Sequence, residues 1–142
     1  GLLLGYADWQ KRGTRSEYQL SLKDVLIIGG AQALALIPGT SRSGITITAA
    51  LMVGMSREGA SRFSFLLSIP VIVLAGGLEA LGLMNASQPI DWSAMLVGTL
   101  LSGISAYLCI HYFLVIIKKL GMQPFVIYRV LFGAWLLWFF HF

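Results

Sequence analysis

The sequence predicts an all-α integral membrane protein, with a re-entrant helical hairpin followed by about three transmembrane helices. Three observations lead to this prediction. Hydrophobic residues make up 57% of the 142-residue chain and charged residues only 11%, which leaves too little polar surface to cover a water-soluble domain of this length. Three apolar runs are long enough to cross a bilayer, and two shorter apolar pieces meet at a polar stretch.

The long apolar runs are predicted to be transmembrane helices, because each can cross a hydrocarbon core of about 30 Å, which takes roughly 20 residues of helix. Residues that favour helix ends separate them: Asp91 is a candidate N-cap, Gly121 a stop and Pro124 a start. The predicted transmembrane helices are residues 63–84, 92–117 and 125–140.

Residues 22–55 are predicted to form the re-entrant hairpin. Two apolar pieces, 22–37 and 45–55, are each shorter than a full span, and the polar sequence PGTSRSG lies between them. The first piece is expected to end at Pro38 and Gly39, since proline lacks a backbone donor and glycine permits unusual dihedral angles. Non-helical backbone at membrane depth needs protein or a water-filled cavity around it, so the tip is expected to lie in a polar pocket.

The distribution of basic residues predicts the orientation of the chain. The loop at 85–91 has none, whereas basic residues lie before the hairpin, after it and after the second long run. By the positive-inside rule, the hairpin then enters and leaves on the cytoplasmic side, and both loop 85–91 and the C-terminus lie outside. Arg129, one turn into the last helix, is interpreted as snorkelling to the interface. The cytoplasmic basic residues are Lys11, Arg12, Arg15, Lys23, Arg57, Arg62, Lys118 and Lys119.

The polar tip has the residues of an anion site. Ser41 or Ser43 can cap the second half-helix, whose first turn offers unpaired N–H groups and the positive end of a dipole. Arg42 and Thr46 are four residues apart, so guanidinium and hydroxyls are expected to converge on one side. An arginine near the bilayer centre costs on the order of 2.5 to 3.5 kcal/mol unless it is paired or hydrated, so an anionic ligand is expected beside it.

Other classes of site are weaker interpretations of the same stretch. Gly39 to Thr46 reads G-x-x-x-x-G-I-T, but Ile45 replaces the lysine of a nucleotide-binding loop. A second alternative is that Arg42 only pairs with a carboxylate between helices. The chain has no basic face with stacking aromatics, so no nucleic-acid partner is expected. Its single cysteine, Cys109, excludes an internal disulfide.

The sequence P-G-T-S-R-S-G-I-T, residues 38–46, resembles the PGxSRSxxT signature of the bacterial undecaprenyl-diphosphate phosphatases, the BacA or UppP family. REGASRFSFLLSIP, residues 57–70, resembles the segment that follows it there. The resemblance implies an integral membrane enzyme that hydrolyses undecaprenyl diphosphate to undecaprenyl phosphate and inorganic phosphate. It further implies a role in recycling the lipid carrier for peptidoglycan synthesis, and bacitracin resistance. The implied location is the bacterial inner membrane, with a site opening to the periplasm.

The resemblance also implies a fold and roles for residues. The family fold has two inverted repeats, each with a re-entrant hairpin, and this chain resembles the second. By resemblance, Arg42 binds the diphosphate, Ser41 and Ser43 supply hydroxyl or backbone contacts, and Thr46 orients phosphate. The implied catalytic residues are Ser41, Arg42, Ser43 and Thr46, and the implied phosphate-binding residues are Gly39, Thr40, Arg42 and Gly44.

The family's glutamate-rich motif and its hydroxyl and histidine cluster have no counterpart in this sequence. The chain is therefore expected to be the C-terminal part of a longer protein and to be inactive alone, with the N-terminal half as its partner. A divalent cation, Mg or Ca, is implied, with ligands mainly outside this chain. A stripe of small residues at Gly98, Ser102 and Ala106 would let another helix pack closely, within the chain or in a homodimer.

Two other functions remain open at this point. A transporter or flippase for an anionic polyprenyl lipid also uses broken helices whose N-termini face an anion. A purely structural membrane module is the third interpretation. The first two differ in whether phosphate is released, since a transporter needs no chemistry.

Overall fold

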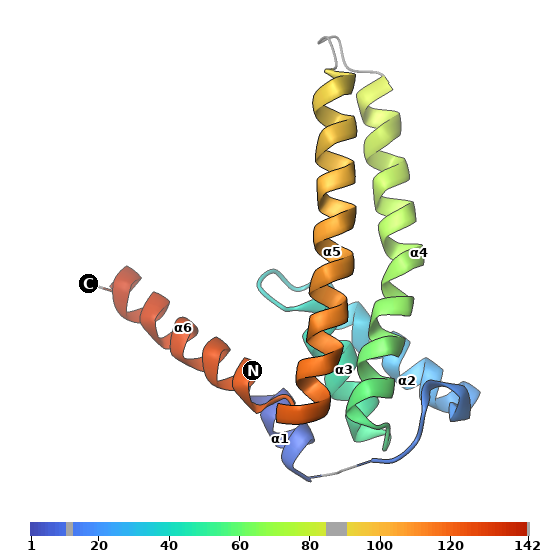
Figure 1. The fold of residues 1–142 in the computed structure, drawn as a ribbon. Helices are drawn as coiled ribbons and strands as arrows, with labels where there is room; N and C mark the ends of the chain where they lie inside the picture. The colour runs from blue at the N-terminus through green and yellow to red at the C-terminus, as the bar shows by residue number, and fades with distance from the viewer. Residues whose placement is uncertain (11–12, 85–90, 142) are drawn as a thin grey trace.

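The structure is a computed structural model that describes residues 1–10, 13–84 and 91–141, and it is built almost entirely from helices (Figure 1). The expected topology signals Lys11 and Arg12 and the expected loop residues 85–90 lie outside the described residues. The helices are α1 (Leu2–Gln10), α2 (Leu22–Ala33), α3 (Arg42–Met52), α4 (Arg57–Met84), α5 (Trp92–Leu120) and α6 (Gln123–His141), with short 3-10 helices η1 (Glu17–Gln19) and η2 (Leu34–Leu36).

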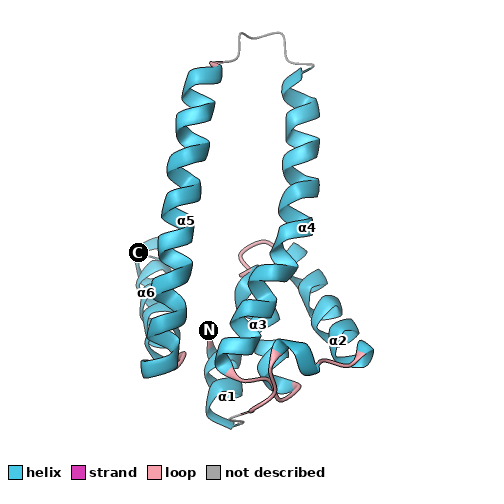
Figure 2. Cartoon of the chain, turned by 45° about the vertical axis from the view of Figure 1, so that its right-hand side comes forward, coloured by secondary structure: helices cyan, strands magenta, loops and turns pink. Residues whose placement is uncertain are grey.

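Three of these helices, α4, α5 and α6, are long and apolar enough to cross a membrane. Helices α4 and α5 touch near one end, where the rings of Phe65 and Phe113 have centroids 5.8 Å apart, and Figure 2 shows their ribbons standing apart over most of their length. In Figure 1, α6 leaves the end of α5 at a steep angle.

Asp91 caps α5 by accepting the N–H groups of Ser93 and Ala94, and Gly121 ends it with a φ of +74°, as the sequence predicts. The Ser93 hydroxyl, which donates to the same carboxylate at 2.6 Å, and the backbone N–H of Ala94 lower the pKa of Asp91.

The long helices extend beyond the apolar runs that identify them. The α4 helix begins at Arg57 and not at residue 63, because Ser56 Oγ accepts the Gly59 N–H at 3.1 Å and caps a first turn that is polar in sequence. The α5 helix continues to Leu120 and α6 begins at Gln123. Hydropathy marks only the part of a helix that faces hydrocarbon, so it misses these polar turns.

Helices α2 and α3 pack together, and the chain reverses direction between them (Figure 2). The prediction that the first half-helix ends at Pro38 was wrong by several residues, since α2 ends at Ala33 and a 3-10 turn follows. Ile37 is extended, with φ −71° and ψ 123°, because a following proline disfavours the helical region. Gly39 has a φ of +86°, a conformation that side chains other than glycine rarely adopt.

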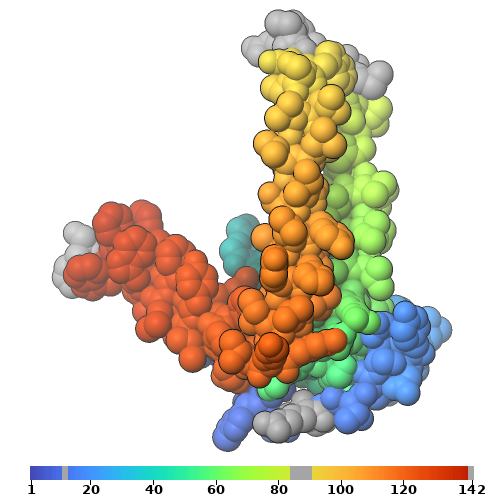
Figure 3. Space-filling model, in the orientation of Figure 1, coloured from blue at the N-terminus to red at the C-terminus, as the bar shows by residue number. Residues whose placement is uncertain are grey.

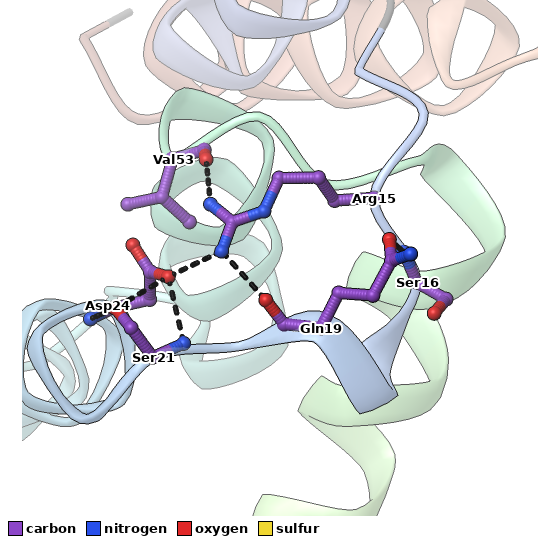
Figure 4. A network of polar contacts seen from close by, with 6 residues as sticks. All are labelled: Arg15, Ser16, Gln19, Ser21, Asp24 and Val53. Carbon is purple, nitrogen blue, oxygen red and sulfur yellow. Dashed lines mark hydrogen bonds and ion pairs between the residues drawn. The ribbon is translucent and has the colours of Figure 1, made fainter.

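The two ends of this helical hairpin are tied together by Arg15. Its backbone forms a parallel β-bridge with Met55, and its guanidinium donates to the carbonyl of Val53 at 3.0 Å and to the carboxylate of Asp24 at 2.7 Å (Figure 4). The guanidinium and the Ser21 groups that donate to the same carboxylate lower the pKa of Asp24 to about 2. Both ends of the hairpin therefore lie at the same end of the molecule.

Helix α3 is the centre of the packing, because it contacts α1, α2 and α4. Its side chains from Thr46 to Leu51 are buried, which makes this short segment the most enclosed part of the chain. The core also includes Leu4, Ala7, Ile28, Met55, Ala60, Ile117, Met122 and Val126.

A buried carboxylate, paired with an arginine, links three helices. Asp8 of α1 is only 2% exposed and accepts from both Nε and Nη2 of Arg57, the second at 3.0 Å. Gln123 Nε2, at the start of α6, donates to the same carboxylate at 3.2 Å. A Cβ atom at Gly121 would lie 2.9 Å from Cζ of Arg57, so the guanidinium packs directly on the turn between α5 and α6.

Replacing Asp8 by alanine is expected to destabilise the fold by about 3 kcal/mol, because Arg57 would keep its charge in a largely enclosed site without its partner. The matched control is Glu17→Ala, which removes a longer ion pair with the exposed Arg62 and should cost about 1 kcal/mol or less. Thermal unfolding of both variants in detergent measures the difference. Equal losses of stability would contradict the conclusion that the buried Asp8 carboxylate holds α1, α4 and α6 together.

Replacing Gly13 by alanine is also expected to destabilise the fold, since the new Cβ would lie 2.2 Å from the carbonyl oxygen of Gly54. A Cβ atom at Gly29, in the middle of α2, would meet no neighbouring element within 4 Å, so Gly29→Ala should be neutral or stabilising by up to about 1 kcal/mol. Unfolding midpoints of the two variants, measured side by side, test this. A Gly13→Ala protein as stable as Gly29→Ala would show that the chains do not approach closely there.

Candidate functional site

The N-terminus of α3 is an open helix end. Ser41, one of the two serines that the sequence offers as caps, is its N-cap, and Ser41 Oγ accepts the Gly44 N–H at 3.2 Å. Within the described residues, the N–H groups of Arg42 and Ser43 have no hydrogen-bond acceptor. The first N–H groups of a helix point along its axis and carry partial positive charge, so this end of α3 attracts an anion.

A pocket of about 360 Å³ adjoins this helix end. Its walls come from the loop before α3, from one side of α3, from the start of α1 and from α6. In Figure 3 the loop, in teal, is visible between α6 in red and α5 in orange. Among the described residues that line the pocket, Arg129 is basic and none is acidic. The lining residues are Gly1, Leu3, Leu4, Gly39, Thr40, Ser41, Gly44, Ile45, Thr48 and Arg129.

Arg129 was missed by the sequence analysis, which interpreted it as a snorkelling residue. Its Nη2 donates to Ser41 Oγ at 2.9 Å, and its Nη1 lies 3.0 Å from where a Cβ atom of Gly44 would be. The guanidinium reaches the loop because Gly44 has no side chain in its way. Ser41 and Arg129 are 88 residues apart, so no local pattern in the sequence indicates this contact.

Arg42 and Ser43 lie beside the same helix end but outside this pocket. The Arg42 side chain is half-buried and forms no ion pair or hydrogen bond with the described residues. Arg15, Arg57 and Arg62, by contrast, each contact a carboxylate. The alternative in which Arg42 only holds helices together through a carboxylate therefore has no support in the described part of the chain.

Ser43 lies between two hollows of the surface. Its hydroxyl oxygen is 3.4 Å from Ser41 Oγ, at the edge of the first pocket. On its other side it lines a second, largely apolar pocket of about 260 Å³. The other residues of that second pocket are Ile47, Phe65, Cys109, Ile110 and Phe113.

The Thr46 hydroxyl is engaged between two helices. Thr46 is 1% exposed, and its hydroxyl oxygen lies 2.6 Å from Ser64 Oγ of α4 and 2.9 Å from the carbonyl oxygen of Arg42. The structure thus places Thr46 in the contact between α3 and α4. The helix turns its neighbour Ile45 toward the pocket instead, because successive residues of a helix point about 100° apart.

A family model and several curated relatives match this chain, and they indicate the same family. A family model described as "Bacitracin resistance protein BacA" matches residues 1–135. A protein of Nitrosococcus oceani named undecaprenyl-diphosphatase is 60% identical over 140 residues, which cover 99% of this chain and 53% of the relative. Undecaprenyl-diphosphatase 2 of Stutzerimonas stutzeri is 61% identical over 140 residues, covering 96% of this chain and 52% of the relative.

The agreement extends to a third relative. The undecaprenyl-diphosphatase of Thioalkalivibrio sulfidiphilus is 59% identical over 140 residues, covering 98% of this chain and 53% of the relative. The chain spans about half the length of the curated relatives it matches. Its signature loop, its three long apolar helices and these matches agree, and the chain belongs to the bacitracin resistance protein BacA family.

Proposed function

We propose that the natural protein containing this chain, called the full-length protein below, is an undecaprenyl-diphosphatase. It hydrolyses undecaprenyl diphosphate to undecaprenyl phosphate and inorganic phosphate, and so recycles the lipid carrier of peptidoglycan synthesis and gives resistance to bacitracin. The observation that carries the proposal is the open N-terminus of α3, beside which Arg42 has no partner among the described residues. The names of the relatives support the choice of substrate.

The part of the reaction that this chain performs is to bind the diphosphate. The N–H groups of Arg42 and Ser43 and the dipole of α3 attract phosphate oxygens. The guanidinium of Arg42 adds a planar set of donors that matches two such oxygens. Gly39 and Thr40, in the loop before α3, line the pocket. Because Gly39 has no side chain, a phosphate oxygen can approach the backbone closely there.

Binding of this kind also lowers the barrier of phosphoryl transfer. Negative charge spreads over the equatorial oxygens in the transition state, and fixed donors stabilise it without having to reorient during the reaction. Thr46 contributes by holding α3 against Ser64 of α4, which fixes the helix end that carries the donors. The nucleophile and the general base are assigned to parts of the full-length protein other than this chain.

The proposal places the hairpin in the membrane as a re-entrant segment. Its two ends are tied together at Arg15 and Met55, at the end of the molecule where Lys118 and Glu58 pair. Figures 1 and 2 both show its loop partway along α4 and not at the end of the long helices. This arrangement supports a cytoplasmic base and a loop at membrane depth. The site then opens toward the periplasm of the inner membrane, in one half of an inverted-repeat fold.

The divalent cation, Mg or Ca, that the family resemblance implies is proposed to take its ligands mainly from parts of the full-length protein outside this chain. Residues 1–10, 13–84 and 91–141 contain no group of three or more His, Cys, Asp or Glu side chains that could hold a metal ion. The carboxylates nearest the base of the hairpin are engaged in ion pairs with arginine or lysine. The described residues therefore do not fit this cation, and no step of the mechanism is routed through it.

Replacing Arg42 by alanine in the full-length protein is expected to lower kcat/KM for phosphate release from undecaprenyl diphosphate by about 100-fold or more, as for loss of one fixed transition-state donor. Arg42→Lys should recover only part of the activity, because an ammonium cannot bind two oxygens as a planar fork. The matched control is Arg62→Ala, which removes an exposed arginine of α4 that pairs with Glu17 near the base of the hairpin. Its kcat/KM should stay close to that of the unchanged protein.

Two results would contradict the proposal in different ways. Full activity of Arg42→Ala would show that the diphosphate does not bind at Arg42, although the protein would still be a phosphatase. A full-length protein that moves the lipid across vesicle membranes without releasing phosphate would support the alternative, a transporter or flippase for an anionic polyprenyl lipid, which the broken helix at the pocket also fits.

The purified chain of residues 1–142 is expected to release no phosphate from farnesyl diphosphate, because it supplies donors for binding and no assigned nucleophile. The full-length protein under the same conditions is the positive control. Release of phosphate by the 142-residue chain at a rate near that of the full-length protein would show that the attacking group lies in this chain.

A further inference from the structure

Ser41 Oγ receives two hydrogen bonds in the structure. The Gly44 N–H donates to it at 3.2 Å, and Nη2 of Arg129 donates to it at 2.9 Å. A serine hydroxyl has one proton to donate and two lone pairs that accept. With both lone pairs occupied by donors, the hydroxyl proton has to point to a third partner. Ser43 Oγ is the nearest side-chain candidate, at 3.4 Å, which is long for a hydrogen bond between hydroxyls.

We propose that Arg129 is a positioning residue that fixes the Ser41 hydroxyl as a hydrogen-bond donor to a phosphate oxygen in the pocket. It follows that Ser41 is not the nucleophile of the reaction. The proposal rests on the proposed function, because it takes a lipid diphosphate as the ligand. Ser41 touches the phosphate, and Arg129 acts through Ser41.

The chemistry of the contact favours this role. A nucleophilic serine needs a lone pair free to attack phosphorus, and it needs a base to take its proton. Here both lone pairs face N–H donors, one of them charged, so neither is free to attack phosphorus. A guanidinium that donates to Oγ also makes the hydroxyl a stronger donor, because hydrogen bonds in a chain polarise one another.

The site is shaped for this guanidinium. A Cβ atom at Gly44 would lie 3.0 Å from Nη1 of Arg129 and 3.2 Å from Ser41 Oγ. Within the described residues Arg129 contacts no carboxylate, although four other basic side chains do. Arg129 therefore places a positive charge without a carboxylate partner among the described residues in a pocket next to the N-terminus of α3. An anion bound there is stabilised both by this charge and by the helix dipole.

The test is a double-mutant cycle in the full-length protein, with kcat and KM measured for phosphate release from undecaprenyl diphosphate. Ser41→Ala and Arg129→Ala should each lower kcat/KM by about 10- to 100-fold, the usual range for a hydrogen bond to a charged group. The double variant should be no worse than the more severe single one, because the two residues act as a unit. Arg129→Lys should recover part of the loss, and Ser41→Ala combined with Arg62→Ala should be additive.

Three results would overturn the inference. Complete loss of turnover in Ser41→Ala would identify Ser41 as the nucleophile. Additive losses from Ser41→Ala and Arg129→Ala would show that Arg129 does not act through Ser41. An Arg129→Ala protein with unchanged kcat/KM would show that Arg129 has no part in the reaction. Failure of the proposed function gives a different result, in which the unchanged protein releases no phosphate at all.

A second variant keeps the test valid if Arg129→Ala does not fold. Gly44→Ala places a methyl group 3.0 Å from Nη1 of Arg129 and 3.2 Å from Ser41 Oγ, and should push these two groups apart while keeping the charge of the guanidinium. Its loss of kcat/KM should match that of Arg129→Gln, with an unfolding midpoint close to that of the unchanged protein. Full activity of a folded Gly44→Ala protein would count against the inference.

Discussion

The buried contact between Asp8 and Arg57 holds together the parts on which the candidate site depends. Asp8 belongs to α1, Arg57 begins α4, and Gln123 begins α6, so a single carboxylate links three helices. A carboxylate 2% exposed is tolerated only with such partners, because an unpaired buried charge is strongly unfavourable. Since α6 is fixed at its first residue, Arg129 lies within about two helical turns of a rigid anchor. That anchor explains why a side chain from the end of the sequence reaches the loop before α3.

The break between α2 and α3 is the second constraint, and it gives the site its chemistry. A helix that starts inside hydrocarbon exposes N–H groups that must find acceptors. Ser41 satisfies one of them, at Gly44, and the N–H groups of Arg42 and Ser43 remain for a ligand. The break between the two helices thus supplies the N–H donors that the proposed phosphate site requires.

Sequence patterns predicted the features that depend on neighbouring residues. A serine cap for α3, left open between Ser41 and Ser43, the cap at Asp91 and the stop at Gly121 follow from local hydrogen bonding and backbone freedom. The three long apolar helices among the described residues follow from their composition. The start of α4 at Arg57 was missed because its first turn is polar and lies outside the apolar run.

Features that depend on packing could not be predicted in this way. The spacing of Arg42 and Thr46 does not indicate that the Thr46 hydroxyl contacts Ser64 of α4. Arg129 carried no signal at all, since its partner lies 88 residues away. Both depend on how helices distant in the sequence meet, which composition and periodicity do not determine.

The central claim is that the N-terminus of α3 binds the diphosphate of the lipid. An experimental structure of the full-length protein with a non-hydrolysable methylene analogue of a polyprenyl diphosphate tests it most directly. The account predicts a phosphonate oxygen within hydrogen-bond distance of the N–H groups of Arg42 and Ser43, with the Arg42 guanidinium on the same group. A diphosphate analogue bound away from this helix end, with those N–H groups facing water or protein, would contradict it.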